Sequence, residues 1–150
     1  MTLIRNTRTL LCLGCLVLFS IQLNSQQLSD EEQVKSVIQN YITNFFTNNY
    51  DAMEISLHDR LSKRGVNQNG QLSENFSKDA LKEMMERNPV FPVKYQKNDI
   101  SDIKIRNRVA TAVLETGYPK TRWVEYIHLA KLNDKWIITD VFWCFDKIVD

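Results

Sequence analysis

Cysteine, glycine, proline and histidine are all scarce in this chain of 150 residues, which contains three, four, three and two of them. The sequence has neither a glycine-rich phosphate loop nor the glycine-flanked turn of a serine nucleophile. Its histidines, His58 and His128, lie far apart with no neighbouring ligand at metal spacing, so a zinc site is not expected. We therefore assign no catalytic motif and expect no cofactor.

The chain also lacks an excess of charge of either sign, with 19 Lys and Arg against 18 Asp and Glu. Two of the basic residues, Arg5 and Arg8, precede the apolar run 10–23 near the N-terminus, and without them 17 basic residues remain. A nearly neutral domain of this kind has no basic patch to attract a polyanion. Nucleic acid is therefore not an expected partner.

No apolar run is long enough to span a membrane. The strongly apolar part of residues 10–23 is about 10 to 14 residues long, whereas a spanning helix needs about 20. Arg5 and Arg8 before this run and the polar Asn24-Ser25-Gln26 after it are typical of a secretory signal. We expect residues 1–25 to be a cleaved signal peptide and residues 26–150 to form the mature domain, exported to the periplasm or secreted, without membrane attachment. The alternatives are a retained N-terminal anchor and lipid attachment at Cys15.

Removal of the signal leaves Cys144 as the one cysteine, which excludes an internal disulfide despite the oxidising compartment. Cys144 lies in the apolar run 141–145. We expect a buried, unreactive thiol there.

The mature domain begins with a clear helical pattern. Ser29 and Glu32 form a capping box, and apolar residues follow it every three or four positions: Val34, Val37, Ile38, Tyr41, Ile42, Phe45 and Phe46. The pattern predicts a long first helix.

Two shorter helices are expected after it. The second runs from Asp51 to a stop at Gly65, on a broken apolar stripe of Ala52, Met53, Leu57 and Leu61. Ser77 caps the third helix, which Pro89 ends near Asn88.

From residue 100 the periodicity changes to that of strands. Four segments are rich in β-branched and aromatic residues and are separated by turn formers: 100–105, 109–116, 123–132 and 135–145. Helices that precede strands favour an α+β fold, in which the N-terminal helices pack on one face of an antiparallel sheet.

This order of elements resembles the nuclear transport factor 2-like superfamily. Two segments are similar to its "Putative lumazine-binding" branch: SLHDRLSKRG at 56–65 and EYIHLAKLNDKWII at 125–138. The resemblance implies a strongly curved, cone-shaped sheet with the helices across its mouth and a cavity for a small hydrophobic or aromatic ligand. The superfamily also includes ketosteroid isomerase, scytalone dehydratase and SnoaL-like cyclases, whose acid and base residues lie in that cavity, but none of these catalytic residues is carried over to a position of this chain.

The register of the last hairpin decides which residues face that cavity. If Asn133 and Asp134 form a two-residue turn, His128 faces Thr139 and Tyr126 faces Val141. The cavity is then lined by polar-tipped and aromatic residues of the last two strands and closed by the first helix: Tyr126, His128, Thr139, Trp143, Tyr41 and Phe45. The alternative is that Tyr126 and His128 are ordinary core residues.

Two further points depend on the same register. His128 and Asp140 lie on opposite faces without a bulge, and a one-residue bulge would bring them together. His58, expected on the second helix, could reach the cone mouth as a further ligand-binding residue or belong to a solvated charged face.

The opposite face of the sheet is expected to be too apolar to remain in water, because it would carry Ile127, Leu129, Ile138 and Phe142. Superfamily relatives commonly dimerise through this face. We therefore expect a homodimer.

Three functions are compatible with these features. The first is an exported small-molecule-binding or interaction domain, and the second is a cofactor-free lyase or isomerase that uses acid and base groups of the cavity. The third is a scaffold whose cone is filled by its own aromatic side chains. An open cavity with a polar base would favour the first two.

Overall fold

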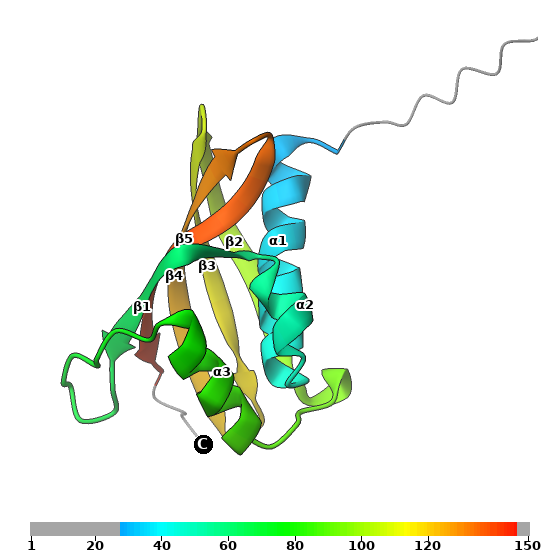
Figure 1. The fold of residues 1–150 in the computed structure, drawn as a ribbon. Helices are drawn as coiled ribbons and strands as arrows, with labels where there is room; N and C mark the ends of the chain where they lie inside the picture. Colours follow the sequence, from blue (N-terminus) through cyan, green and yellow to red (C-terminus); the bar gives the residue numbers. More distant parts are fainter. Residues whose placement is uncertain (1–27, 147–150) are drawn as a thin grey trace, which may run out of the picture.

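The computed structural model describes residues 28–146, in which helices pack against one curved sheet (Figure 1). The helical elements are α1 (Asp30–Phe46), α2 (Tyr50–Glu54), α3 (Lys78–Arg87) and the 3-10 turn η1 (Val93–Tyr95). The strands are β1 (Leu57–Val66), β2 (Lys97–Arg106), β3 (Val109–Tyr118), β4 (Thr121–Leu132) and β5 (Lys135–Phe145). The expected signal peptide, residues 1–25, lies outside the described residues. Between residues 28 and 146 no helix has the length and apolar character needed to cross a membrane.

The sheet has the strand order β1-β5-β4-β3-β2. Strands β2 to β5 form the expected antiparallel meander, and β1 pairs in parallel with β5. The predicted α+β class with a strongly curved sheet is confirmed, and β1 makes the sheet mixed rather than wholly antiparallel.

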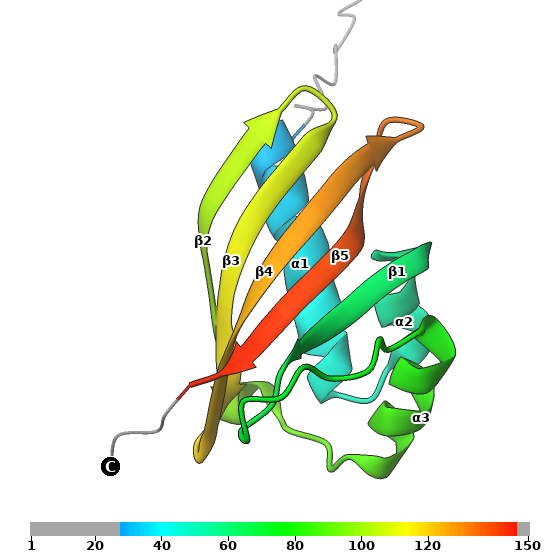
Figure 2. The same ribbon diagram turned by 90° about the vertical axis from the view of Figure 1, so that its left-hand side faces the viewer.

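Helix α1 lies across the inner, concave face of the sheet, behind the strands in Figure 2. Its capping box is present, with the Ser29 hydroxyl accepting from the Glu32 amide and the Glu32 carboxylate accepting from the Ser29 amide. The helix buries one stripe, Val34, Ile38, Tyr41, Ile42 and Phe46, against the strands. This packing forms the centre of the core.

The expected second helix is wrong beyond Glu54, because the chain enters strand β1 at Leu57. Leu57 and Leu61 are four residues apart, a spacing that fits both a helical stripe and one face of a strand. The burial of Leu61, Lys63 and Gly65 shows the strand period of two. Gly65 therefore lies inside the strand and does not end a helix.

Three irregularities in the strand pairing bend the sheet around α1 (Figure 2). They fall in β2 before Lys104, in β4–β5 after His128, and in β1 before Ser62. All adjoin one row of paired residues that crosses the sheet: Lys104, Thr111, His128, Asp140 and Ser62. Because a bulge bends and twists its strand, this alignment accounts for the strong curvature.

The β4–β5 irregularity also overturns the expected register. The two-residue turn is present, with Asn133 and Asp134 at φ 48° and 60°, and Leu132 pairs with Lys135 as expected. Thr139 is then an extra residue, so His128 pairs with Asp140. A shift of one residue exchanges the two faces of a strand relative to its neighbour.

Candidate functional site

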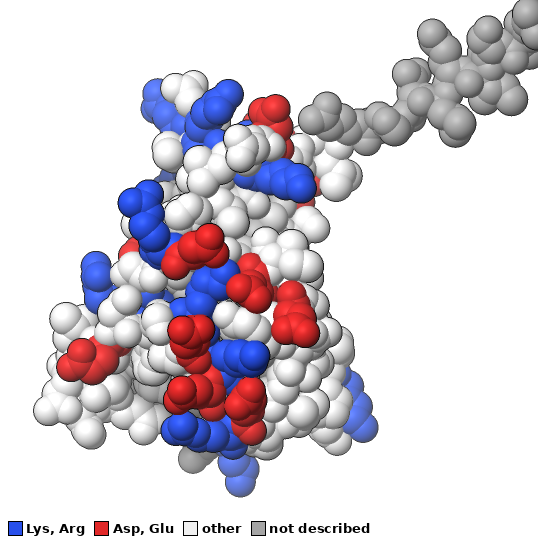
Figure 3. Space-filling view, in the orientation of Figure 1, with Lys and Arg blue, Asp and Glu red and all other residues white. Residues whose placement is uncertain are grey.

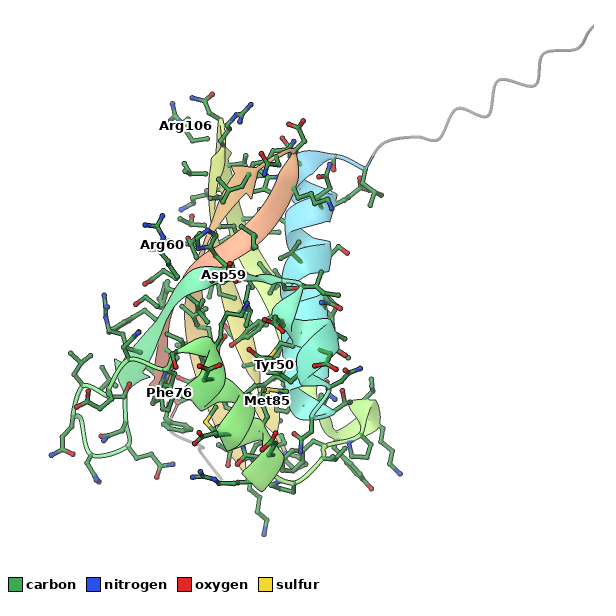
Figure 4. The ribbon with its side chains drawn as sticks, viewed as in Figure 1. Tyr50, Asp59, Arg60, Phe76, Met85 and Arg106 are labelled. Carbon is green, nitrogen blue, oxygen red and sulfur yellow. The ribbon has the colours of Figure 1, made fainter. Side chains whose placement is uncertain are left out.

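A cavity of about 230 Å³ lies between the inner face of the sheet, the end of α1 and helix α3. Most of its wall is aromatic: Phe45, Phe76, Tyr118, Trp123, Trp143 and Phe145. Figure 4 shows Phe76 on the segment that joins β1 to α3, next to that helix. Met84 and Asn88 complete the side formed by α3, and the polar part of the wall is Lys63 and Glu125.

Lys63 and Glu125 form a buried ion pair. The Nζ atom of Lys63 lies 2.5 Å from Glu125 Oε1, and their side chains are only 6% and 2% exposed. Removing such charges from water costs several kcal/mol per ion, so each needs nearby partners. Both side chains have them, because further hydrogen bonds surround the pair.

Tyr41 and Trp123 supply these hydrogen bonds. The Tyr41 hydroxyl accepts from Lys63 Nζ at 2.6 Å and donates to Glu125 Oε2 at 2.9 Å, and the Trp123 indole N–H donates to Glu125 Oε1 at 3.1 Å. We call Tyr41, Lys63, Trp123 and Glu125 the polar cluster. It joins α1, β1 and β4 at the wall of the cavity.

The polar cluster keeps Tyr41 in its protonated form. Burial, the nearby Glu125 charge and the hydrogen bond to that carboxylate raise the pKa of Tyr41 well above its usual value of 10. The phenol therefore remains a hydrogen-bond donor throughout the physiological pH range.

Strand alternation places these groups on the inner face. Lys63 and Gly65 face inward from β1, and Glu125 and Trp143 face each other across β4 and β5. Gly65 makes room for Trp143, since a Cβ atom at this position would clash with the Trp143 backbone oxygen and with its indole ring. The glycine thus allows Trp143 to form one wall of the cavity.

Three of the residues expected from the sequence lie at this site. Trp143 and Phe45 line the cavity. Tyr41 is 1% exposed and belongs to the polar cluster behind the wall.

The expected inward orientation of Tyr126, His128 and Thr139 is wrong. The extra residue at Thr139 shifts the pairing of β4 with β5 by one residue, so the side chains of β4 that were expected to face the cavity face outward. Tyr126 is 56% exposed on the convex outer face, and His128 is exposed beside it. Thr139, at the bulge, donates to the His128 carbonyl. The bulge also brings His128 Nδ1 within 3.6 Å of Asp140 Oδ1, on the face away from the cavity.

The same reversal changes the expected outer face. Ile127, Leu129 and Ile138 are at most 1% exposed in the core, whereas Phe142 does lie on the outer face. Cys144 is exposed on that face rather than buried. All five placements follow from strand alternation once the register is known.

His58 is the second residue of β1 and lies away from the cavity, in a separate groove beside the N-terminal half of α1. Its Nδ1 accepts a hydrogen bond from the Arg60 amide. No three potential metal ligands come together anywhere between residues 28 and 146.

Sequence reasoning missed the polar cluster as a unit. Lys63 lies in the segment that was expected to be the second helix, and neither Lys63 nor Glu125 is among the residues expected to line the cavity. An acidic residue inside the strongly apolar β4 segment was the available signal, because a buried carboxylate requires a partner. Finding that partner required knowing that 57–66 is a strand.

Solved structures with the same fold support this description. An NTF2-like protein of unknown function from Shewanella baltica OS155 has a TM-score of 0.70 at 16% identity, with 81% of this chain and 99% of that chain covered. Another, from Methylobacillus flagellatus KT, has a TM-score of 0.67 at 20% identity, with 81% and 97% covered. A ketosteroid isomerase-like protein from Erwinia carotovora atroseptica SCRI1043 has a TM-score of 0.56 at 13% identity, with 79% and 99% covered. At these identities the likeness establishes the fold alone.

No curated protein matches the sequence. The family model described as "Putative lumazine-binding" matches residues 29–143, which include the whole cavity wall except Phe145. With its nuclear transport factor 2-like fold, the chain belongs to this family.

Proposed function

We propose that this protein binds one small, planar and largely apolar molecule in the cavity beside the polar cluster. The observation that carries the proposal is the combination of an aromatic wall with a buried ion pair in the same cavity. Binding pockets for small molecules typically pair apolar surfaces with a few fixed polar groups that orient the ligand.

The size of the cavity limits the ligand. A cavity of about 150 Å³ can hold benzene, and drug-sized ligands occupy about 300 Å³ or more. At about 230 Å³ the cavity suits a molecule of one or two rings. Lumazine, which gives the family its description, is a planar molecule of two fused rings and is a suitable first probe of that size.

Isothermal titration calorimetry with lumazine tests the proposal. Met84 faces the cavity from α3, so Met84→Trp should fill part of the space and weaken binding by about tenfold or more, which is 1.4 kcal/mol. Glu83→Trp is the matched control, because Glu83 is exposed on the same helix and lies outside the cavity wall. Equal affinity of both variants would place any binding elsewhere, and no heat with the unmodified protein would count against lumazine-like ligands.

A cofactor-free isomerase is the second candidate, favoured by the Glu125 carboxylate in the cavity wall. Such an enzyme would take a proton from one carbon of a ketone and return it to another. Three donors already surround Glu125, which favours binding over proton transfer. Conversion of cyclohex-3-enone to its conjugated isomer, lost in Glu125→Gln, would establish catalysis.

Export and dimerisation are part of the same proposal. The layout of residues 1–25 supports cleavage close to Gln26, which mass spectrometry of the exported protein tests. An intact Met1 or a diacylglycerol mass on Cys15 would contradict cleavage there.

The exposed Tyr126 and Phe142, paired across β4 and β5, support a homodimer through the outer face of the sheet.

A further inference from the structure

The polar cluster leaves one donor and one acceptor unused. The Lys63 ammonium has three N–H groups, of which two are donated to Tyr41 and Glu125. Glu125 Oε1 accepts from Lys63 and Trp123, while the main contact of Oε2 is the Tyr41 hydroxyl. Among residues 28–146 no other acceptor takes the third Lys63 hydrogen. Both side chains line the cavity, so this remaining capacity is available to a ligand.

The formal charges of Lys63 and Glu125 cancel, and no other charged side chain lines the cavity in the described part of the chain. An anionic ligand that approached Lys63 would therefore also face the Glu125 carboxylate. A cationic ligand would meet the Lys63 ammonium in the same way. Because the pair is almost completely buried, solvent and salt screen these repulsions weakly.

The face of the protein that carries α2, α3 and β1 shows no preference for one sign of charge either. Acidic and basic side chains alternate over α2, α3 and β1 on the face shown in Figure 3. This face includes α3, which forms one side of the cavity. Long-range attraction of a charged ligand is therefore not expected from this face.

We infer that the cavity selects an uncharged ligand with an amide-like edge, whose acceptor binds Lys63 and whose donor binds Glu125. The inference rests on the proposed function, since it names the chemistry of the ligand in the same cavity. The ion pair serves as a neutral donor and acceptor unit, and the aromatic wall holds the rest of the molecule.

Three probes of the same size and shape test this selection: benzamide, benzoate and benzamidinium, which are neutral, anionic and cationic at pH 7. Titrations followed by ¹H-¹⁵N NMR should show benzamide binding at least about tenfold more tightly than either ion, the ratio supplied by one hydrogen bond to a charged group. Equal affinities would overturn the inference and leave cavity binding intact. Failure of all three probes to bind would instead count against the proposed function, and the inference would fall with it.

Charge variants give a second, independent outcome. Glu125→Gln leaves Lys63 uncompensated and should reverse the preference in favour of benzoate, whereas Lys63→Met should reverse it in favour of benzamidinium. Lys82→Met is the control, because Lys82 is exposed on α3 outside the cavity wall, and it should leave the order unchanged. A preference for benzamide that persists in both folded single variants would contradict the role of the pair. Where a single variant fails to fold, the affinities of the three probes for the unmodified protein test the inference.

Discussion

At the residue scale, Tyr41 connects helix α1 to the buried ion pair. Tyr41→Phe removes a hydroxyl that bonds both Lys63 and Glu125, so the free energy of unfolding should fall by about 2 kcal/mol. Urea denaturation measures the loss. Tyr50→Phe is the control, because Tyr50 is only half-buried, and it should change the stability by less than about 0.5 kcal/mol. Equal stabilities of the two variants would contradict the bridging role of Tyr41.

The raised pKa of Tyr41 determines how the stability difference between the unmodified protein and Tyr41→Phe depends on pH. The native state favours the protonated phenol, so the contribution of Tyr41 is complete below pH 10 and declines as the pH rises above that value. The difference between the unmodified protein and Tyr41→Phe should therefore narrow in alkali.

Single residues also show what the sequence could reveal. The Ser29 cap of α1 was predicted correctly, because a capping box is a local pattern of two residues three positions apart. Lys63 and Glu125 are 62 positions apart, and their pairing depends on the parallel contact of β1 with the meander. No local pattern encodes that contact.

At the scale of elements, Asp30 fastens the start of α1 to the β4–β5 hairpin. Its carboxylate accepts from Lys131 Nζ at 2.5 Å and from the Trp136 indole at 3.0 Å. Hydrogen bonds from Lys131 and then Trp136 lower the pKa of Asp30 below its usual 3.8. A lowered native pKa stabilises the fold above pH 3.8, and this stabilisation disappears as the pH falls through the native value.

Asp30→Asn should therefore reduce the melting temperature at pH 7 and have progressively less effect below pH 3.8. Thermal unfolding of both proteins across this range tests the prediction. Glu31→Gln is the control, since Glu31 is exposed in the same helical turn. A deficit of Asp30→Asn that stayed constant down to pH 2 would exclude the ionic explanation.

Two elements differ from the sequence-based expectation for physical reasons. Leu57 and Leu61 fit either period, and only tertiary pairing with β5 selects the strand. The extra residue at Thr139 has no sequence signal comparable to a glycine or proline. It nevertheless exchanges the inward-facing and outward-facing side chains of β4 relative to the expected register. The fold class was predictable from the order of elements, whereas the lining of the cavity required the register.

At the scale of the whole molecule, the proposed dimer is tested by sedimentation. The protein should be dimeric at tens of micromolar, a range in which interfaces of standard size hold, and Tyr126→Asp should make it monomeric. Ile55→Asp is the control, because Ile55 is an exposed apolar residue away from the outer face of the sheet. A monomeric unmodified protein would rule out this interface.

The three tryptophans provide the most direct test of the central claim, that the cavity binds a small planar molecule. Trp123 and Trp143 line the cavity, whereas Trp136 bonds Asp30 outside the cavity wall. Titration of ¹⁵N-labelled protein with lumazine, followed through the indole N–H signals, should shift those of Trp123 and Trp143 together and leave that of Trp136 in place. A shift of Trp136 alone, or three unchanged signals at millimolar lumazine, would contradict the claim.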